Sequence, residues 1–237
     1  MNFKKNITLL VLLFSITACT ENTTRNWLQE TLTQQLTSGE IGRAFKQALT
    51  IASKDVVSQV GKTDGFNSDP SIHIPLPDSL NTVKNVLSKF GMSKTIDDLE
   101  LKLNRAAEKA TPKAQALFLD AISQMTFDDI KGIYNGPEDS ATRYFKQKMT
   151  PELIKEMRPI INESLSQVGA VQTFDQIMSK YQALPFVPDV KAELTDHVLG
   201  KSMDGIFFYM AQEETAIRKD PVKQTTALLK KVFGSRY

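Results

Sequence analysis

The chain has 237 residues, of which 41 % are hydrophobic and 24 % are charged, and this composition excludes a largely disordered protein. The formal net charge is +2, and Lys4 and Lys5 supply it, because residues 1–18 contain no acidic side chain. Removing these two lysines leaves 27 of the 29 basic residues against 27 acidic ones. That balance argues against a nucleic-acid binder, whose affinity depends on neutralising phosphates.

Residues 1–18 have the parts of a secretory signal peptide. Lys4 and Lys5 form a positively charged start, and residues 7–16 form a short run that is apolar except for Thr8 and Ser15. A membrane-spanning helix needs about 20 apolar residues, so this run is too short to span a bilayer. We therefore predict a cleaved leader.

The only cysteine of the chain, Cys19, ends the tetrad ITAC at residues 16–19. This tetrad resembles the bacterial lipobox, in which an aliphatic residue and two small residues precede a lipid-modified cysteine. The resemblance implies that Cys19 becomes the acylated first residue of the mature chain, and two or more acyl chains hold a protein firmly at a bilayer. Because Thr20 follows and not Asp, the resemblance implies the periplasmic face of the outer membrane of a Gram-negative bacterium. The alternatives are an ordinary leader with a chance cysteine and a buried thiol.

The mature chain is helical in its periodicity almost throughout. After a polar tether at residues 19–25, apolar residues recur every three or four positions, which predicts a single all-α domain over 26–237 with about ten helices. We expect an N-terminal helical pair at 26–61, a crossover loop at 62–78 and the main helical body at 79–237.

Two parts of this N-terminal region carry distinct signals. Trp27 and three leucines predict a first amphipathic segment, and Ser38 and Gly61 bracket a second, longer one. In the crossover loop, Ile72, Ile74 and Leu76 alternate with less apolar residues, so a short extended segment near 70–76 is expected.

Proline follows a capping residue at three places in the main body, and each pair predicts a helix start. These pairs are Thr111-Pro112, Thr150-Pro151 and Asp220-Pro221. Pro159 lies inside the segment after Thr150 and is expected to kink or break it. Residues 126–129, TFDD, resemble a capping box.

Distinctive stretches of the chain are similar to an uncharacterised bacterial family, domain-of-unknown-function family 4197. They are IPLPDSL (74–80), LNRAAEKATPKAQALFLDAISQMTFDD (103–129), ATRYF (141–145), DGIFFYMAQEETAIRKDP (204–221) and LLKKVF (228–233). The resemblance implies a helical envelope domain, usually behind a leader. It implies no activity and no functional residue.

Polar residues within these stretches are the candidates for a site. They are Asn104, Arg105, Glu108, Asp120, Asp204, Glu213, Glu214 and Arg218. Arg105 and Glu108 lie three positions apart, and Glu214 precedes Arg218 by four, the favourable order for a helical ion pair. The favoured interpretation is salt bridges and caps that fix packing. The alternative is a polar pocket that binds an anion through Arg105 and Arg218, or uses paired carboxylates as acid and base.

The sequence contains no recognisable motif for a metal, a cofactor or a catalytic nucleophile. It has two histidines, lacks the zinc motif His-Glu-x-x-His and the hydrolase motif Gly-x-Ser-x-Gly, and has no glycine-rich phosphate loop. We expect no metal and no cofactor. The sequence favours a non-enzymatic, membrane-anchored periplasmic module that binds an envelope component, such as an envelope protein. The alternative is a small-molecule or lipid-binding domain, or a cryptic hydrolase, using the polar residues above.

Overall fold

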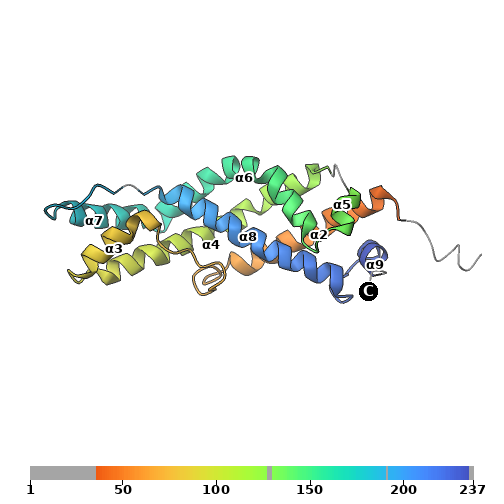
Figure 1. Ribbon diagram of the computed structural model, residues 1–237, viewed down its shortest axis with the longest axis horizontal. Helices are drawn as coiled ribbons and strands as arrows, with labels where there is room; N and C mark the ends of the chain where they lie inside the picture. The colour runs from red at the N-terminus through yellow and green to blue at the C-terminus, as the bar shows by residue number, and fades with distance from the viewer. Residues whose placement is uncertain (1–35, 127–129, 191, 235–237) are drawn as a thin grey trace, which may run out of the picture. The chain divides into compact units, whose positions relative to one another are not determined.

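The computed structural model describes residues 36–126, 130–190 and 192–234 (Figure 1). These residues form eight α-helices and one short 3₁₀ helix, and none of them is in a β-strand. The predicted all-α class is therefore confirmed, with fewer helices than the ten expected. Among the described helices, none combines the length and the apolar character that crossing a bilayer requires.

The described helices vary widely in length. They are α2 (Ser38–Val60), η1 (Asp78–Leu80), α3 (Asn81–Ser88), α4 (Ser93–Gln124), α5 (Ile130–Asn135), α6 (Ser140–Gln167), α7 (Ala170–Gln182), α8 (Leu194–Lys219) and α9 (Ala227–Phe233).

The long helix α4 is the centre of the packing. It lies against α2, α6, α7 and α8, while α8 also packs on α6 and α2 (Figure 1). Phe118 of α4, Phe145 of α6 and Phe207 of α8 meet in the core with ring centroids 5.8–6.3 Å apart. Such pairs add about 0.5–1.5 kcal/mol each beyond the burial of their area, so this cluster fixes how the three long helices meet.

The Thr111-Pro112 pair does not begin a helix, which corrects the prediction. Both residues lie inside α4, which runs unbroken from Ser93 to Gln124. The Thr111 hydroxyl donates to the Ala107 carbonyl oxygen at 2.8 Å, as a side chain within a helix does. The Pro112 ring is exposed, whereas the residues on the core face of the same turn, Thr111 and Ala114, are buried.

Helix α6 likewise continues through two prolines. Pro151 and Pro159 both lie inside Ser140–Gln167, so the first does not start a helix and the second does not end one. Both prolines are exposed, whereas Leu153, Met157 and Ile161 are buried against the neighbouring helices. Tertiary packing of that apolar face keeps the helix intact despite the lost hydrogen bonds.

Asp220 caps a turn instead of the last helix. It follows the end of α8, and its Oδ1 accepts from the backbone N–H of Val222 at 2.9 Å. Helix α9 begins seven residues later, at Ala227, and its N-cap is Thr226, whose Oγ1 accepts from the Leu229 N–H at 3.2 Å. The expected leader, the tether, the segment around Trp27 and residues 127–129 of the capping box lie outside the described residues.

Residues 61–77 link α2 to η1 and contain no strand. The alternation seen in the sequence is nevertheless a packing pattern, because Ile72, Ile74 and Leu76 are buried while Pro75 is exposed. Five residues, 73–77, have no regular secondary structure. The segment thus packs against helices, which supply the partners that a neighbouring strand would otherwise provide.

Candidate functional site

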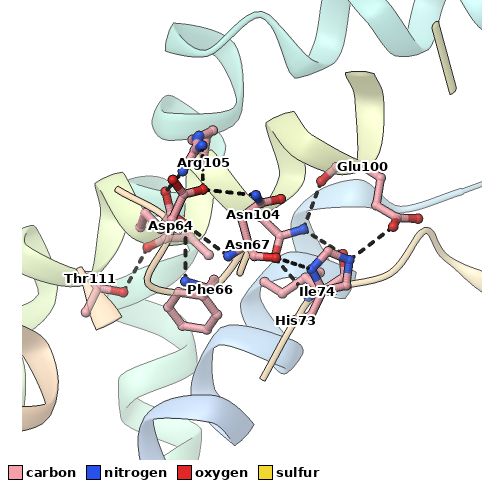
Figure 2. A network of polar contacts seen from close by, with 11 residues as sticks. Asp64, Phe66, Asn67, His73, Ile74, Glu100, Asn104, Arg105 and Thr111 are labelled. Carbon is pink, nitrogen blue, oxygen red and sulfur yellow. Dashed lines mark hydrogen bonds and ion pairs between the residues drawn. The ribbon is translucent and has the colours of Figure 1, made fainter. Parts of the chain in front are cut away.

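Loop 61–77 lies along a stripe of polar side chains on α4 (Figure 2). Glu100, Asn104 and Glu108 are spaced four residues apart, so they project from one face of the helix. Each of them accepts hydrogen bonds from backbone N–H groups of the loop. The stripe therefore supplies acceptors for the backbone N–H groups of the loop, as a neighbouring strand does in a sheet.

Asn104 forms a two-way pair with the loop backbone. Its Oδ1 accepts from the Ile74 N–H at 2.9 Å, and its Nδ2 donates to the Ile74 carbonyl oxygen at 2.8 Å. Nδ2 also donates to the Glu100 carbonyl oxygen at 2.9 Å. The Asn104 side chain is 0 % exposed, so its polar atoms depend on these protein partners.

Glu108 is a buried carboxylate whose charge is compensated on both oxygens. Oε1 accepts from the N–H groups of Phe66 and Asn67 at 3.1 and 3.0 Å. Oε2 accepts from Arg105 Nη1 at 2.7 Å. Charge-assisted hydrogen bonds of this kind offset the desolvation of a buried carboxylate.

Arg105 links this carboxylate to the loop. Its Nη2 donates to Asp64 Oδ1 at 2.8 Å, and Asp64 also accepts from Asn67 Nδ2 at 3.0 Å. The hydrogen bond to Glu108 is the main reason why the pKa of Arg105 is raised. The pKa of Asp64 is lowered, first by the Asn67 amide and then by Arg105.

His73 completes the network at the far end of the stripe. Its Nδ1 lies 2.9 Å from the Asn67 carbonyl oxygen, and its Nε2 lies 3.0 Å from Glu100 Oε1. Glu100 Oε2 accepts from the Leu76 N–H at 3.2 Å. A carbonyl group and an ionised carboxylate only accept hydrogen bonds, so the His73 ring is the donor in these contacts.

Helix α8 holds the loop from the other side. The Tyr209 hydroxyl donates to Asp69 Oδ2, and His197 Nε2 lies 2.7 Å from the Pro75 carbonyl oxygen. Gly205 makes room for the loop, since a Cβ atom there would lie 2.9 Å from Phe66 Cε1. Loop 61–77 is thus fixed between α4 and α8.

A second polar group lies at the start of α6, where Glu214 of α8 meets the helix N-terminus. Glu214 Oε1 accepts from the Ala141 N–H at 3.1 Å, and Oε2 accepts from the Thr142 N–H and hydroxyl, both at 2.7 Å. The first N–H groups of a helix have no partner within it and favour negative charge. Glu214, which is 0 % exposed, therefore caps α6 from another helix.

Arg218 balances this buried carboxylate. Its Nη2 donates to Glu214 Oε1 at 2.6 Å and to Ser140 Oγ at 2.9 Å. The guanidinium carbon lies 4.7 Å from the ring centroid of Phe45 and 5.8 Å from that of Phe233. Nε and Nη1 have no hydrogen-bond partner among the described residues, so the aromatic faces are the groups that compensate this side of the cation.

The other three predicted site residues lie in contacts of their own. Glu213 pairs with Lys223 at 2.9 Å, and this contact raises the pKa of Lys223. Asp204 pairs with Lys146 at 2.8 Å on the surface, and Asp120 accepts from Gln124 one turn along α4 at 2.7 Å. The eight predicted residues thus fall into one group under loop 61–77, one group at the start of α6, and separate surface pairs.

An open cleft of about 460 Å³ lies beside the first group, and Arg105 and Glu108 form part of its lining. Lys102 and Lys109 also line it. Lys102 is occupied by Asp98 at 2.8 Å and by the Thr173 hydroxyl at 2.7 Å. The cleft therefore presents charges of both signs, most of them already paired.

Sequence reasoning missed the loop partners of this stripe, among them Asp64 and His73, and the capped residue Thr142. The four-residue spacing of Glu100, Asn104 and Glu108 was a signal that could have identified the stripe itself. Nothing local identified its partners, because they lie 24 to 42 residues away in the chain. Within the described parts of the chain, no group of three or more His, Cys, Asp or Glu side chains could hold a metal ion.

The fold and the polar network define an all-helical protein in which buried polar side chains fasten a long ordered loop and a helix start. A family model described as a protein of unknown function, DUF4197, matches residues 35–234. The chain belongs to this family, which confirms the resemblance seen in the sequence. Comparison with curated proteins and with solved structures found no match.

Proposed function

We propose that this protein is a non-catalytic lipoprotein of the bacterial envelope, whose helical part binds an envelope component at the periplasmic face of the outer membrane. The observation that carries the proposal is the leader. A positive start with Lys4 and Lys5, a short apolar run and the tetrad at 16–19 occur together, and the only cysteine of the chain stands at the end of that tetrad.

The roles of the buried polar groups support a binding module over an enzyme. Glu214 and Arg218 are 0 % and 1 % exposed, so a substrate has no access to them without opening of the core. Glu108 is 3 % exposed, and both its oxygens already accept hydrogen bonds. A general acid or base has to reach the proton that it transfers, and these carboxylates instead hold a loop and a helix.

Lipidation is tested by changing the cysteine and its neighbour in the full chain. Cys19→Ser should abolish acylation and cleavage and release the chain from the outer membrane fraction, since one uncleaved leader replaces several acyl chains. Thr20→Ser is the matched control and should leave acylation, cleavage and the outer membrane location unchanged. Thr20→Asp should leave acylation intact and move the protein to the inner membrane. Mass spectrometry of the mature N-terminus reads the modification directly.

Two results would contradict this proposal. One is a mature N-terminus other than Cys19, and the other is an unmodified thiol at that position in cells. The binding part is tested separately by crosslinking the anchored protein in cells and identifying its partners, with the Thr20→Asp form as the control for location. Crosslinking that captures no envelope component from the native location would count against a binding role.

The open cleft beside Arg105 favours a second candidate function, the binding of a small anion. Lys109 is exposed, lines the cleft and has no ion pair to a described residue, so its charge is available to a ligand. Titration of the protein with inorganic phosphate, followed by NMR, should then shift signals of residues around the cleft. Lys109→Ala should weaken the shifts and Lys54→Ala, on the exposed face of α2, should not. Absence of saturable shifts would remove this candidate.

A further inference from the structure

Two phenylalanine side chains are exposed at the same end of the helical unit. Phe90 lies in the turn between α3 and α4 and is 64 % exposed, and Phe186 lies in the turn after α7 and is 103 % exposed. Helices α3 and α7 pack against each other, and both of these turns lie at the left end of Figure 1. Residues 88–95 and 179–188 are called the aromatic tip below.

The backbone of the tip holds these side chains outward. Phe186 has φ +61°, a left-handed conformation that is uncommon for a bulky residue, and Pro185 and Pro188 flank it. Gly91 has φ +80° and directly follows Phe90. Residues held in such conformations tend to cluster at functional positions, and here the conformation coincides with full exposure of an aromatic ring.

The charge of the tip is uniformly positive. It contains Lys89, Lys94 and Lys180 and no acidic residue, and the nearest acids in sequence are Asp97 and Asp189. The three lysines are exposed, and none of them forms an ion pair with a described residue. Exposed aromatic side chains on turns that also carry exposed lysines match the interface of an anionic bilayer, where rings enter the acyl region and ammonium groups stay among the headgroups.

We propose that the aromatic tip inserts into a lipid bilayer that contains anionic lipids. The two rings protrude on convex turns, and a fluid bilayer accepts such protrusions without needing a shaped pocket. The proposal goes beyond the Cys19 anchor, and it rests on the proposed function only in that the anchor brings the tip close to a bilayer.

The tip and the start of α2 lie at opposite ends of the unit. Glu40, in the first turn of α2, pairs with Lys231 of α9, and α9 follows the C-terminus of α8, whereas Phe186 precedes the N-terminus of α8. Helix α4, the longest described helix, is about 48 Å long, so contact of the tip with the bilayer that holds the anchor requires the described helices to lie along the bilayer surface.

Tryptophan fluorescence of the full, lipidated chain tests the position of the tip. Trp27 is the only tryptophan, so Trp27→Phe provides a silent background for Phe90→Trp, Phe186→Trp and the control Val222→Trp. Val222 is 84 % exposed and lies in the turn after α8. In vesicles with brominated acyl chains, the bromine atoms should quench the emission of the two tip tryptophans. Iodide in the aqueous phase should instead quench the emission of the tryptophan at position 222.

The outcomes separate the two proposals. Chains that do not float with vesicles at all lack the anchor, which contradicts the proposed function. Chains that float while tip tryptophans are quenched by iodide as fully as position 222 overturn the tip proposal alone, and would point to a protein surface as the occupant.

A second measurement uses the unlipidated chain. In a chain that starts at residue 19 and carries Cys19→Ser, so that neither the leader nor acyl chains are present, Phe90→Ser combined with Phe186→Ser should weaken partitioning onto vesicles of phosphatidylethanolamine and phosphatidylglycerol by about a hundredfold or more, while Val222→Ser should not. Replacing the three lysines with glutamine should remove the preference for anionic vesicles over phosphatidylcholine. Equal partitioning of the tip variants and the control would overturn the proposal.

Discussion

The side-chain amide of Asn104 pairs with the backbone of Ile74 in both directions, through hydrogen bonds of 2.9 and 2.8 Å. A helix residue thereby supplies the donor and the acceptor that a neighbouring strand would supply to an extended segment. The pair is buried, and it joins residues thirty positions apart in the chain. The loop between α2 and α3 depends on it for its position on α4.

Asn104→Ala should destabilise the fold by about 1–3 kcal/mol, because the N–H and C=O groups of Ile74 would be left buried without partners. Asn85→Ala is the matched control. Asn85 is exposed on α3, and this change should be neutral or slightly stabilising, since alanine is the better helix former. Urea unfolding followed by circular dichroism measures both, and equal stabilities of the two variants would contradict the role given to Asn104.

Gly205→Ala should destabilise the protein by about 1–3 kcal/mol through overpacking. The new Cβ would lie 2.9 Å from Phe66 Cε1 and 3.1 Å from Ile72 Cβ, so loop 61–77 would have to move. Gly200→Ala in the same helix is the control. It meets nothing within 4 Å and should stabilise the helix by about 0.5–1 kcal/mol. Thermal unfolding should move the two melting temperatures in opposite directions, and a shift of the same sign would be against this account.

Glu214→Ala should cost about 3–5 kcal/mol, because it leaves Arg218 as an uncompensated buried cation. It also removes the acceptor for the Ala141 and Thr142 N–H groups at the start of α6. The double variant Glu214→Gln with Arg218→Met should be milder, since the amide oxygen still caps α6 and no charge remains buried.

The control for this pair is Glu213→Ala, which breaks only the partly exposed contact with Lys223 and should cost less than about 1 kcal/mol. Chemical denaturation of all three variants gives the comparison. If Glu214→Ala were no worse than Glu213→Ala, the carboxylate would not be the cap of α6.

Stability should fall in acid because two loop carboxyls have lowered pKa values in the folded state. The Tyr209 hydroxyl is the main cause for Asp69, and Asn67 followed by Arg105 is the cause for Asp64. An unfolded aspartate titrates near pH 3.9. The contribution of these groups is therefore present above about pH 4 and is lost as the pH falls through their lower folded pKa values.

The hydrogen bond between Tyr209 and Asp69 also predicts how stability changes at alkaline pH. The pKa of Tyr209 is raised, chiefly by its hydrogen bond to Asp69, so its contribution is present below about pH 10 and is lost as the pH rises further. Tyr209→Phe should reduce the pH dependence at both extremes, whereas Tyr144→Phe should leave it unchanged on the acid side. Free energies of unfolding measured across the pH range test this prediction. An unchanged pH dependence in Tyr209→Phe would contradict the role given to the hydrogen bond between Tyr209 and Asp69.

The helical class, the core face of each long helix and the family could be predicted from residue spacing. Helix boundaries at Thr111-Pro112 and Thr150-Pro151 could not, because local capping signals compete with tertiary packing. Docking of the apolar faces of α4 and α6 on neighbouring helices outweighs the cost of a proline inside a helix, which is about 3 kcal/mol for each proline. At Asp220 the side chain accepts from the Val222 N–H in a turn, and the last helix is capped by Thr226.

The sequence by itself determined that the protein is helical, nearly neutral after residue 18, and equipped with one cysteine behind a leader-like segment. These properties depend on composition and on residues close together in the chain. Only the tertiary structure decided which polar residues meet. Glu108 reaches the backbone of Phe66, and Glu214 reaches Thr142. The packing of α3 on α7 likewise brings the turns that follow these two helices to one end of the unit. Such meetings depend on how helices pack, and no local pattern in the chain encodes the distance between segments that packing brings together.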